Sequence, residues 1–402
     1  MNNAELRIHT IRYPQRAKLD ADFLKIFSPF HTIQLVIGSC RVNPLNGYLS
    51  IPVWYQRAYS LMLVILNIFI YIYISGVYSS KFKSYPGVQD LMNILIPLHF
   101  SSYFVNIIHV RFCRGRDNVA LYKKIQELDR IMKIDKNKTV NEMMFKRNVI
   151  AVFIVLLPFI ALLPIAINVG VSATVITLGI ASTQSPFILD VTQSITFIIH
   201  FSSRILIINS ILMNYLNSKM RIMMMRSKVR GSRFMRELVE KNYEFASSET
   251  DVYLRKIFDC FTIYQELYKF QIFVFCCKIV GYSILAFQFT LLTIQNNIME
   301  LYDGILVVTL AIVDSSTLIL VCVHCEIFFR EIKKLKLLTI TLMAAFNQGP
   351  LRNKAKRMFT MIEETTPRFY VYDMWEMDAG FLLSFTNVIT GLIVTLLQFA
   401  FL

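Results

Sequence analysis

Seven apolar stretches of about 20 residues constrain what this chain can fold into. Each is long enough to cross the hydrocarbon core of a bilayer as a helix. Apolar residues make up 55% of the chain, yet its formal net charge is +15. The two are compatible when apolar and basic residues occupy different segments. We therefore predict an all-α membrane protein with seven transmembrane helices, near residues 58–78, 90–110, 148–169, 186–204, 274–295, 304–325 and 380–402.

Lysine and arginine collect in alternate connections, and this bias predicts the orientation of the chain. They crowd the segment before the first span and the second, fourth and sixth connections, whereas residues 170–186 and 295–304 contain neither. Since basic connections stay on the cytoplasmic side, we predict the N-terminus inside and the C-terminus outside. A G-protein-coupled type of receptor has the opposite orientation, so the pattern disfavours that class.

The same pattern divides the chain into two parts. Residues 1–56 are predicted to form a cytoplasmic N-terminal region, in which the interrupted apolar stretch 21–40 lies at the membrane interface. Residues 57–402 form the seven-helix domain. Apolar residues recur at helical spacing between residues 214 and 270, which predicts a cytoplasmic helical anchor region.

Enzyme chemistry finds no support in the sequence. There is no Gly-rich phosphate loop, no His-Glu-x-x-His motif and no nucleophile elbow. We expect no catalytic residue, no metal ion and no cofactor. The basic residues are explained by orientation and by attraction to anionic lipid, so no nucleic acid partner is expected.

The last apolar stretch carries a polar stripe. Steps of three and four residues place its five members on one helical face. Each polar group facing hydrocarbon without a partner costs several kcal/mol, order of magnitude. The stripe therefore faces a water-filled pore or a hydrogen-bonded helix contact, and this helix alone leaves both alternatives open. Its members are Ser384, Asn387, Gly391, Thr395 and Gln398.

Polar residues inside the other spans are candidates for a ligand pocket, because such groups are costly at membrane depth. Asp314, near the middle of the sixth span, is the strongest; each of the others alone is also typical of helix packing. Lys278 and Arg204 are interpreted as markers of the inner membrane boundary, with Tyr282 and Phe289 as pocket walls. The candidate ligand-binding residues are His99, Tyr103, Asp190, Gln193, Gln288 and Asp314.

The C-terminal run from Thr386 to Phe399 resembles the signature of insect gustatory receptors, which is Thr-Tyr, five apolar residues, then Gln-Phe. Gln398 and Phe399 match it residue by residue, while Gly391 and Leu392 stand at the Thr-Tyr positions and mark a divergent member. The resemblance, which extends to length and layout, implies kinship with insect odorant receptors. It also implies a tastant-gated, non-selective cation channel in the plasma membrane of gustatory receptor neurons.

In such a channel, the resemblance implies, four subunits of one or several kinds surround a pore that is lined by the last helix and passes monovalent and divalent cations. Sugar-sensing members carry Glu after Thr-Tyr, where this chain has Ile393. By exclusion, bitter plant compounds are the expected ligands, and Asp190 or Asp314 could pair with an amine. Two alternatives stay open: a seven-span metabotropic chemoreceptor, and a non-conducting partner subunit of other gustatory receptors.

Overall fold

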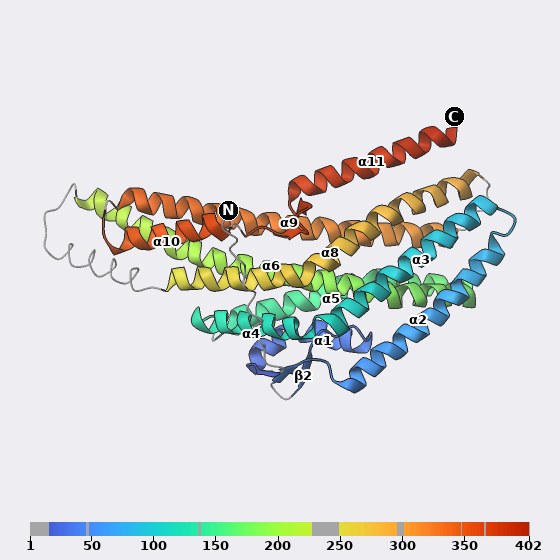
Figure 1. The fold of residues 1–402 in the computed structure, drawn as a ribbon, viewed down its shortest axis with the longest axis horizontal. Helices are drawn as coiled ribbons and strands as arrows, with labels where there is room; N and C mark the ends of the chain where they lie inside the picture. The colour runs from blue at the N-terminus through green and yellow to red at the C-terminus, as the bar shows by residue number, and fades with distance from the viewer. Residues whose placement is uncertain are drawn as a thin grey trace, which may run out of the picture.

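The computed structural model is an elongated bundle whose long helices run roughly along one axis (Figure 1). It describes residues 16–45, 48–135, 138–226, 249–295, 301–346, 348–365 and 367–401. The elements in chain order are β1 (Arg16–Lys18), α1 (Ala21–Val36), β2 (Asn43–Leu45), β3 (Tyr48–Ser50), α2 (Trp54–Lys81), α3 (Pro86–Ile108), the π-helix η1 (His109–Cys113), α4 (Gly115–Ile131), α5 (Lys138–Val169), α6 (Val171–Arg226), α8 (Thr250–Gln295), α9 (Leu301–Ala345), α10 (Pro350–Thr365), β4 (Tyr370–Val371), β5 (Trp375–Glu376) and α11 (Ala379–Phe401).

Within the described residues, seven helices are long and apolar enough to cross a membrane: α2, α3 with η1, α5, α6, α8, α9 and α11. The predicted number of spans is thereby confirmed. Their burial differs widely, because 67% of the apolar window of α6 is buried inside the molecule but none of that of α11. Helix α6 is therefore the central helix, and α11 lies at the periphery.

The fourth predicted span, near residues 186–204, lies within the much longer helix α6. Helix α6 begins at Val171 and not near residue 186, and the segment expected as a connection is helical. Gly170, with φ +139°, separates α5 from α6, a conformation that L side chains rarely adopt. Because residues 170–186 contain no charged residue, their sequence does not distinguish a loop from a helix. The structure has a tight hairpin at Gly170 in place of a long connection. Residues 227–248 of the predicted anchor region lie outside the described residues.

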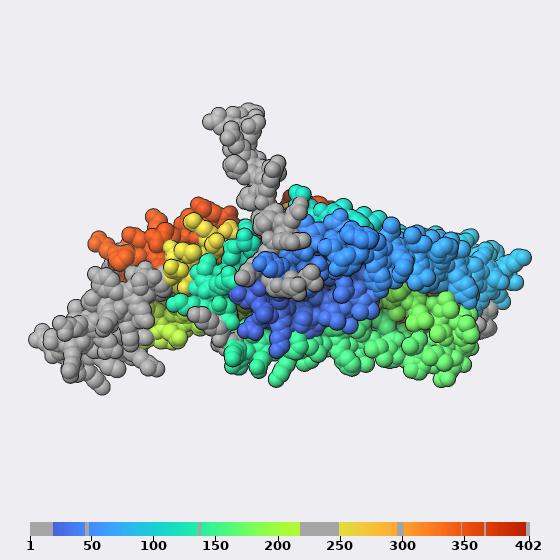
Figure 2. Space-filling view, turned by 90° about the horizontal axis from the view of Figure 1, so that it is seen from below, coloured from blue at the N-terminus to red at the C-terminus, as the bar shows by residue number. Residues whose placement is uncertain are grey.

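The N-terminal element packs onto the bundle. Its strands form a three-stranded antiparallel sheet in the order β1-β3-β2, and α1 packs against α5. Phe27 and Phe30 of α1 are fully buried, and the Phe27 ring meets the Tyr122 ring edge-on at 5.1 Å. Seen from below, this dark-blue element lies against the teal and green helices (Figure 2). One face of α1, with Phe23, Ile26, Phe27 and Phe30, thus belongs to the hydrophobic core.

Helix α11 is anchored at its beginning. The hairpin β4–β5 precedes it, and the Asp378 carboxylate accepts a hydrogen bond from the Phe381 backbone N–H at 2.7 Å, which caps the helix. The Trp375 ring stacks on Phe273 of α8 and on Phe381, with centroids 5.9 and 5.7 Å apart. Phe381, Leu382, Phe385 and Ile389 pack against the core, and the C-terminal end of the helix lies apart from the bundle (Figure 1).

Candidate functional site

A small apolar cavity of ≈ 50 Å³ lies between α2, α3, α6, α8 and α9. Aromatic and aliphatic side chains form most of its wall, and its polar members are few, which is the usual composition of a small-molecule site. A ligand larger than a few water molecules requires the wall to move. The lining residues are Ile74, Tyr78, Met92, Leu95, Ile96, His99, Phe100, Ile180, Tyr282, Phe289, Asp303, Leu306, Val307 and Leu310.

Polar groups of the cavity wall are held by neighbouring helices. The Tyr78 hydroxyl donates to Asp303 at 3.1 Å, and the Lys81 ammonium lies 2.7 Å from the other carboxylate oxygen. Lys81 is 25% exposed, so this pair connects the cavity wall to the surface. At the deeper end, His99 Nε2 lies 2.9 Å from the Thr183 hydroxyl. The cavity therefore has an ion pair at one end and an imidazole at the other.

A buried ionic cluster lies one helical turn from the cavity wall. The Lys278 ammonium is 2.9 Å from Asp314 and donates to the Gln184 side-chain oxygen at 2.5 Å. The Gln184 amide in turn donates to Asp314 at 2.5 Å. We call Gln184, Lys278 and Asp314 the Lys278 cluster. Both charged side chains are less than 5% exposed, and such a pair is stable only when its remaining hydrogen bonds are made.

Each member of the Lys278 cluster is four residues from a cavity-lining residue on its own helix. The pairs are Gln184 with Ile180 on α6, Lys278 with Tyr282 on α8, and Asp314 with Leu310 on α9. Residues four apart lie on the same helical face. A shift of any of these three helices at the cavity therefore moves one corner of the cluster.

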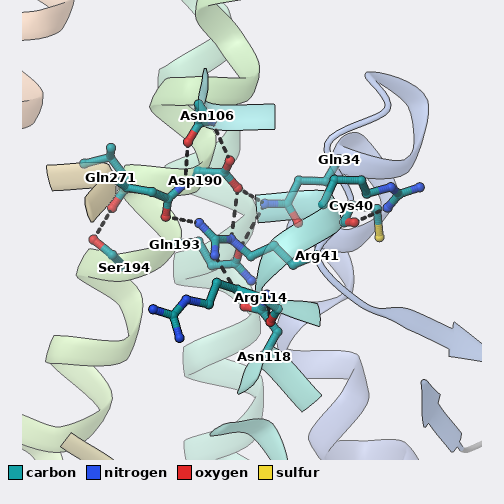
Figure 3. Close-up of polar contacts among 12 residues, drawn as sticks. Gln34, Cys40, Arg41, Asn106, Arg114, Asn118, Asp190, Gln193, Ser194 and Gln271 are labelled. Carbon is teal, nitrogen blue, oxygen red and sulfur yellow. Dashed lines mark hydrogen bonds and ion pairs between the residues drawn. The ribbon is translucent and has the colours of Figure 1, made fainter. Parts of the chain in front are cut away.

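A second polar network surrounds Asp190 (Figure 3). Its carboxylate accepts hydrogen bonds from Gln34 at 3.0 Å and from Asn106 at 3.0 Å, and forms an ion pair with Arg41 at 3.1 Å. Gln34 also donates to Gln193 at 2.8 Å. Asp190 and Gln193 are fully buried. We call these residues with Gln271 the Asp190 network, and it fastens α1 and the following loop to α3, α6 and α8.

The charge of Arg41 is stabilised at this position. Arg41 donates to Asn118 at 3.3 Å and to Gln271, and its guanidinium lies 4.4 Å from the centre of the Tyr268 ring. Burial is the largest single effect and lowers the pKa of Arg41, but Asp190, Tyr268 and Tyr122 together outweigh it, and the pKa is raised overall. Sequence reasoning missed Arg41, whose signal is a basic residue directly after an apolar helix.

Nearby, burial lowers the pKa of His31 to about 4. Its Nε2 lies 3.1 Å from the Tyr122 hydroxyl, which also accepts from Gln193 at 2.5 Å. Burial raises the pKa of Tyr122 well above its ordinary value. The two rings are therefore a neutral hydrogen-bonded pair at neutral pH, and His31 is the member that a mildly acidic medium can charge in the unfolded chain.

The interpretation of Lys278 and Arg204 as boundary markers is wrong. Both side chains are buried. Lys278 is bound within its cluster, and Arg204 forms two hydrogen bonds to Asp129 of α4, at 2.9 and 2.8 Å. A buried cation needs a partner, and both partners come from helices distant in the sequence, so the pairing could not be read from the neighbouring residues.

The six candidate ligand-binding residues are placed in different surroundings. His99 lines the cavity, and the predicted walls Tyr282 and Phe289 line it as well. Asp314 is in the Lys278 cluster, while Asp190 and Gln193 are in the Asp190 network. Two others are elsewhere: Tyr103 is buried beside Asn67, at 3.3 Å, and Gln288 is half-buried outside the cavity wall.

The polar stripe of α11 points away from the helices of its own chain. All five members, from Ser384 to Gln398, are exposed. The opposite face is partly buried at Phe385 and Ile389, which pack against the hydrophobic core. The stripe therefore faces outward from the bundle, whereas the neighbouring helices of the chain present apolar surfaces outward.

Comparison of the whole structure with solved structures places the fold. The chain resembles the insect olfactory receptor OR5 from Machilis hrabei, with a TM-score of 0.59 at 12% identity, covering 94% of this chain and 99% of the receptor. The same receptor in complex with eugenol gives a TM-score of 0.55 at 12% identity over the same shares. No protein-family profile and no curated protein matches the sequence. The chain has the fold of an insect olfactory receptor.

Proposed function

We propose that this chain is a subunit of a ligand-gated, non-selective cation channel in the plasma membrane, and that it detects small molecules as a member of the insect chemoreceptor families. The fold shared with an olfactory receptor supports membership of this group. In the proposed orientation the N-terminus is cytoplasmic, the C-terminus is outside, and the ends of α6 and α9 with α10 form the cytoplasmic anchor.

The outward-facing stripe of α11 carries the proposal. In a single chain this stripe would lie against lipid, where polar groups without partners are unfavourable. If further subunits surround an axis next to α11, the same side chains line a water-filled pore and the cost disappears. The stripe holds no acidic residue, which is typical of weak discrimination among cations. A homo- or heterotetramer is the assembly that the sequence resemblance implies.

The cavity between α2, α3, α6, α8 and α9 is the proposed ligand site, with His99 and Tyr282 among its polar contacts. Ligand entry moves the wall, because the empty cavity is small. The Lys278 cluster then transmits the movement to α9, since Asp314 is one turn from the wall residue Leu310. Helix α9 packs on α11, so this route ends at the helix proposed to line the pore. In this proposal Asp314 acts through the cluster and not by touching the ligand.

The gustatory assignment and a bitter plant compound as ligand are the finer part of the proposal. They depend on the Gln398–Phe399 match in the last helix and on Ile393, which stands where sugar-sensing members carry Glu. An apolar wall with a single imidazole and two tyrosines suits a partly aromatic ligand.

Cysteine labelling tests the pore directly. Thr395→Cys places a thiol on the stripe, and Ile393→Cys places one on the opposite face of the same turn. A charged methanethiosulfonate reagent applied during ligand-evoked current is expected to block the first variant and spare the second. Cys113 and Cys277 are exposed, so the parent chain must be shown to be insensitive. Equal block of both variants, or of neither while current flows, would refute the pore assignment.

A further inference from the structure

A second hollow lies outside the receptor bundle, where the chain enters its first span. It is a groove of ≈ 750 Å³ between the segment that joins β3 to α2 and the junction of η1 with α4. Helix α2, the first candidate span, begins at this groove, and η1, which continues α3 to the end of the second, ends at it. The groove therefore lies at one boundary of the membrane. Its lining residues are Ser50, Ile51, Pro52, Val53, Trp54, Arg57, Phe112, Cys113, Gly115, Arg116 and Asp117.

The groove carries positive charge that the described part of the chain does not neutralise. Arg57 and Arg116 have no ion-pair partner among the described residues. The Nε of Arg57 is buried and makes no hydrogen bond to the described residues, which is costly unless a ligand accepts a hydrogen bond from it. The one acidic member, Asp117, is 3.0 Å from Arg114 and is therefore already paired.

Two helices point their N-termini toward this groove. Helix α2 starts at Trp54 and α4 at Gly115, and neither first turn is capped by a side chain. Their free N–H groups and helix dipoles favour an anion. Gly115 allows the close approach, because a Cβ at this position would lie 3.0 Å from Ile51.

Apolar side chains accompany the charges. Trp54 is 79% exposed and Phe112 is 44% exposed, and tryptophan is enriched where membrane meets water. A free phosphate would make no use of these rings, whereas the upper part of an acyl chain would cover them. The groove thus combines an anion site with an apolar surface at the membrane boundary.

We propose that this groove binds an anionic glycerophospholipid, with the phosphate held by Arg57, Arg116 and the two helix N-termini, and the glycerol and acyl chains against Trp54 and Phe112. The site does not depend on the ligand-gated channel proposed above, since it shares no lining residue with the cavity and includes none of the α11 stripe. In the proposed orientation it faces the inner leaflet, where anionic lipids are abundant.

Tryptophan fluorescence tests the proposal, because the chain has only two tryptophans. In the full-length Trp375→Phe background, Trp54 is the sole reporter. The protein is placed in mixed micelles that hold equal amounts of phosphatidylserine and phosphatidylcholine, and only one of the two lipids carries bromine, which quenches nearby indole. Stronger quenching by brominated phosphatidylserine at identical total composition measures local enrichment of the anionic lipid.

We expect this enrichment to fall roughly fivefold for each arginine replaced by glutamine, a factor corresponding to about 1 kcal/mol per basic side chain at a membrane surface. The doubly substituted Arg57→Gln/Arg116→Gln protein should show almost no preference, and Arg57→Lys/Arg116→Lys should keep most of it. The matched control, Arg255→Gln/Lys256→Gln, removes two charges from the start of α8 and should behave like the parent. Gel filtration verifies that each variant is folded.

Equal quenching by both brominated lipids in the parent would overturn the proposal, and so would an equal loss in the α8 control. Millimolar inorganic phosphate separates a lipid site from a site for soluble phosphate. Unchanged quenching supports the lipid, whereas loss of the preference on adding phosphate would show that the groove binds the free anion.

Discussion

Replacing Asp314 with asparagine tests whether the Lys278 cluster is a structural ion pair of the folded bundle. The Nζ–Oδ2 distance of 2.9 Å corresponds to about 6 kcal/mol of attraction at an effective dielectric constant of about 20. Breaking one side of such a buried pair costs roughly 3–5 kcal/mol. The asparagine oxygen still accepts from Lys278, so we expect the lower end, about 3 kcal/mol.

Thermal unfolding in detergent, followed by gel filtration, measures the effect. At about 2.1 cal/mol/K per residue, the unfolding entropy of the 402-residue chain is about 0.8 kcal/mol/K. Asp314→Asn should therefore lower the Tm by about 3–4 °C. The control is Glu266→Gln, which breaks a lysine–carboxylate pair on the same helix α8. That pair has Lys269 22% and Glu266 55% exposed, and exposed pairs contribute about 0–1 kcal/mol.

The double variant Lys278→Met/Asp314→Leu removes both charges and should be more stable than Asp314→Asn, because no uncompensated ammonium remains. If Asp314→Asn unfolds within about 1 °C of the Glu266→Gln control, a margin of about 0.8 kcal/mol, the charges are not closely paired and the proposed link between cavity and α9 fails.

Three further predictions concern the pore, the cavity and pH. Gln398→Ala should change conductance or ion selectivity and leave ligand potency nearly unchanged, measured from single-channel currents and dose–response curves. Leu306→Trp fills the cavity and should abolish the ligand response, whereas Ile312→Trp, on the same helix but 62% exposed, should not. Lowering the pH from 7 to 5 should reduce the unfolding free energy through His31 by roughly 2 kcal/mol, because the unfolded imidazole takes up a proton near pH 6.5 while the folded one stays neutral to about pH 4. The same pH change should have a smaller effect on the thermal stability of His31→Gln.

Each of these three predictions has a result that would contradict it. A pure potency change in Gln398→Ala would indicate that the stripe is a packing surface. Loss of response in both tryptophan variants would point to general overpacking and not to the cavity. Identical pH dependence of the His31→Gln variant and the parent would show that this imidazole is accessible to protons in the folded chain.

Hydropathy alone was sufficient to predict the seven helices, since each crossing needs about 20 apolar residues. The stripe on α11 was also readable, because its members follow the period of a single helix. By contrast, the burial of Lys278 and Arg204 depends on Asp314 and Asp129, which lie on other helices. A basic residue near the end of an apolar run looks the same whether it reaches water or meets a distant carboxylate.

The residues expected at the ligand site divide in the same way, into those that the sequence of one helix predicts and those whose surroundings depend on other helices. His99, Tyr282 and Phe289 could be predicted as wall residues from their polar or aromatic character within apolar spans. Asp190, in contrast, was expected near a ligand, whereas the structure gives its carboxylate hydrogen-bond partners on α1, α3 and the loop after α1. Which polar faces meet depends on the packing of α6 among its neighbours, and no single helix records it.

Current recorded from the chain expressed alone, with its presence at the surface verified, tests the central claim most directly. Bitter plant compounds and then sugars are applied to excised inside-out patches without GTP, with the compound supplied through the pipette to the outer face. The channel proposal predicts a rapid cation current that persists in these patches. A ligand-evoked current in intact cells that disappears on excision and returns only with GTP would contradict it and favour a metabotropic receptor.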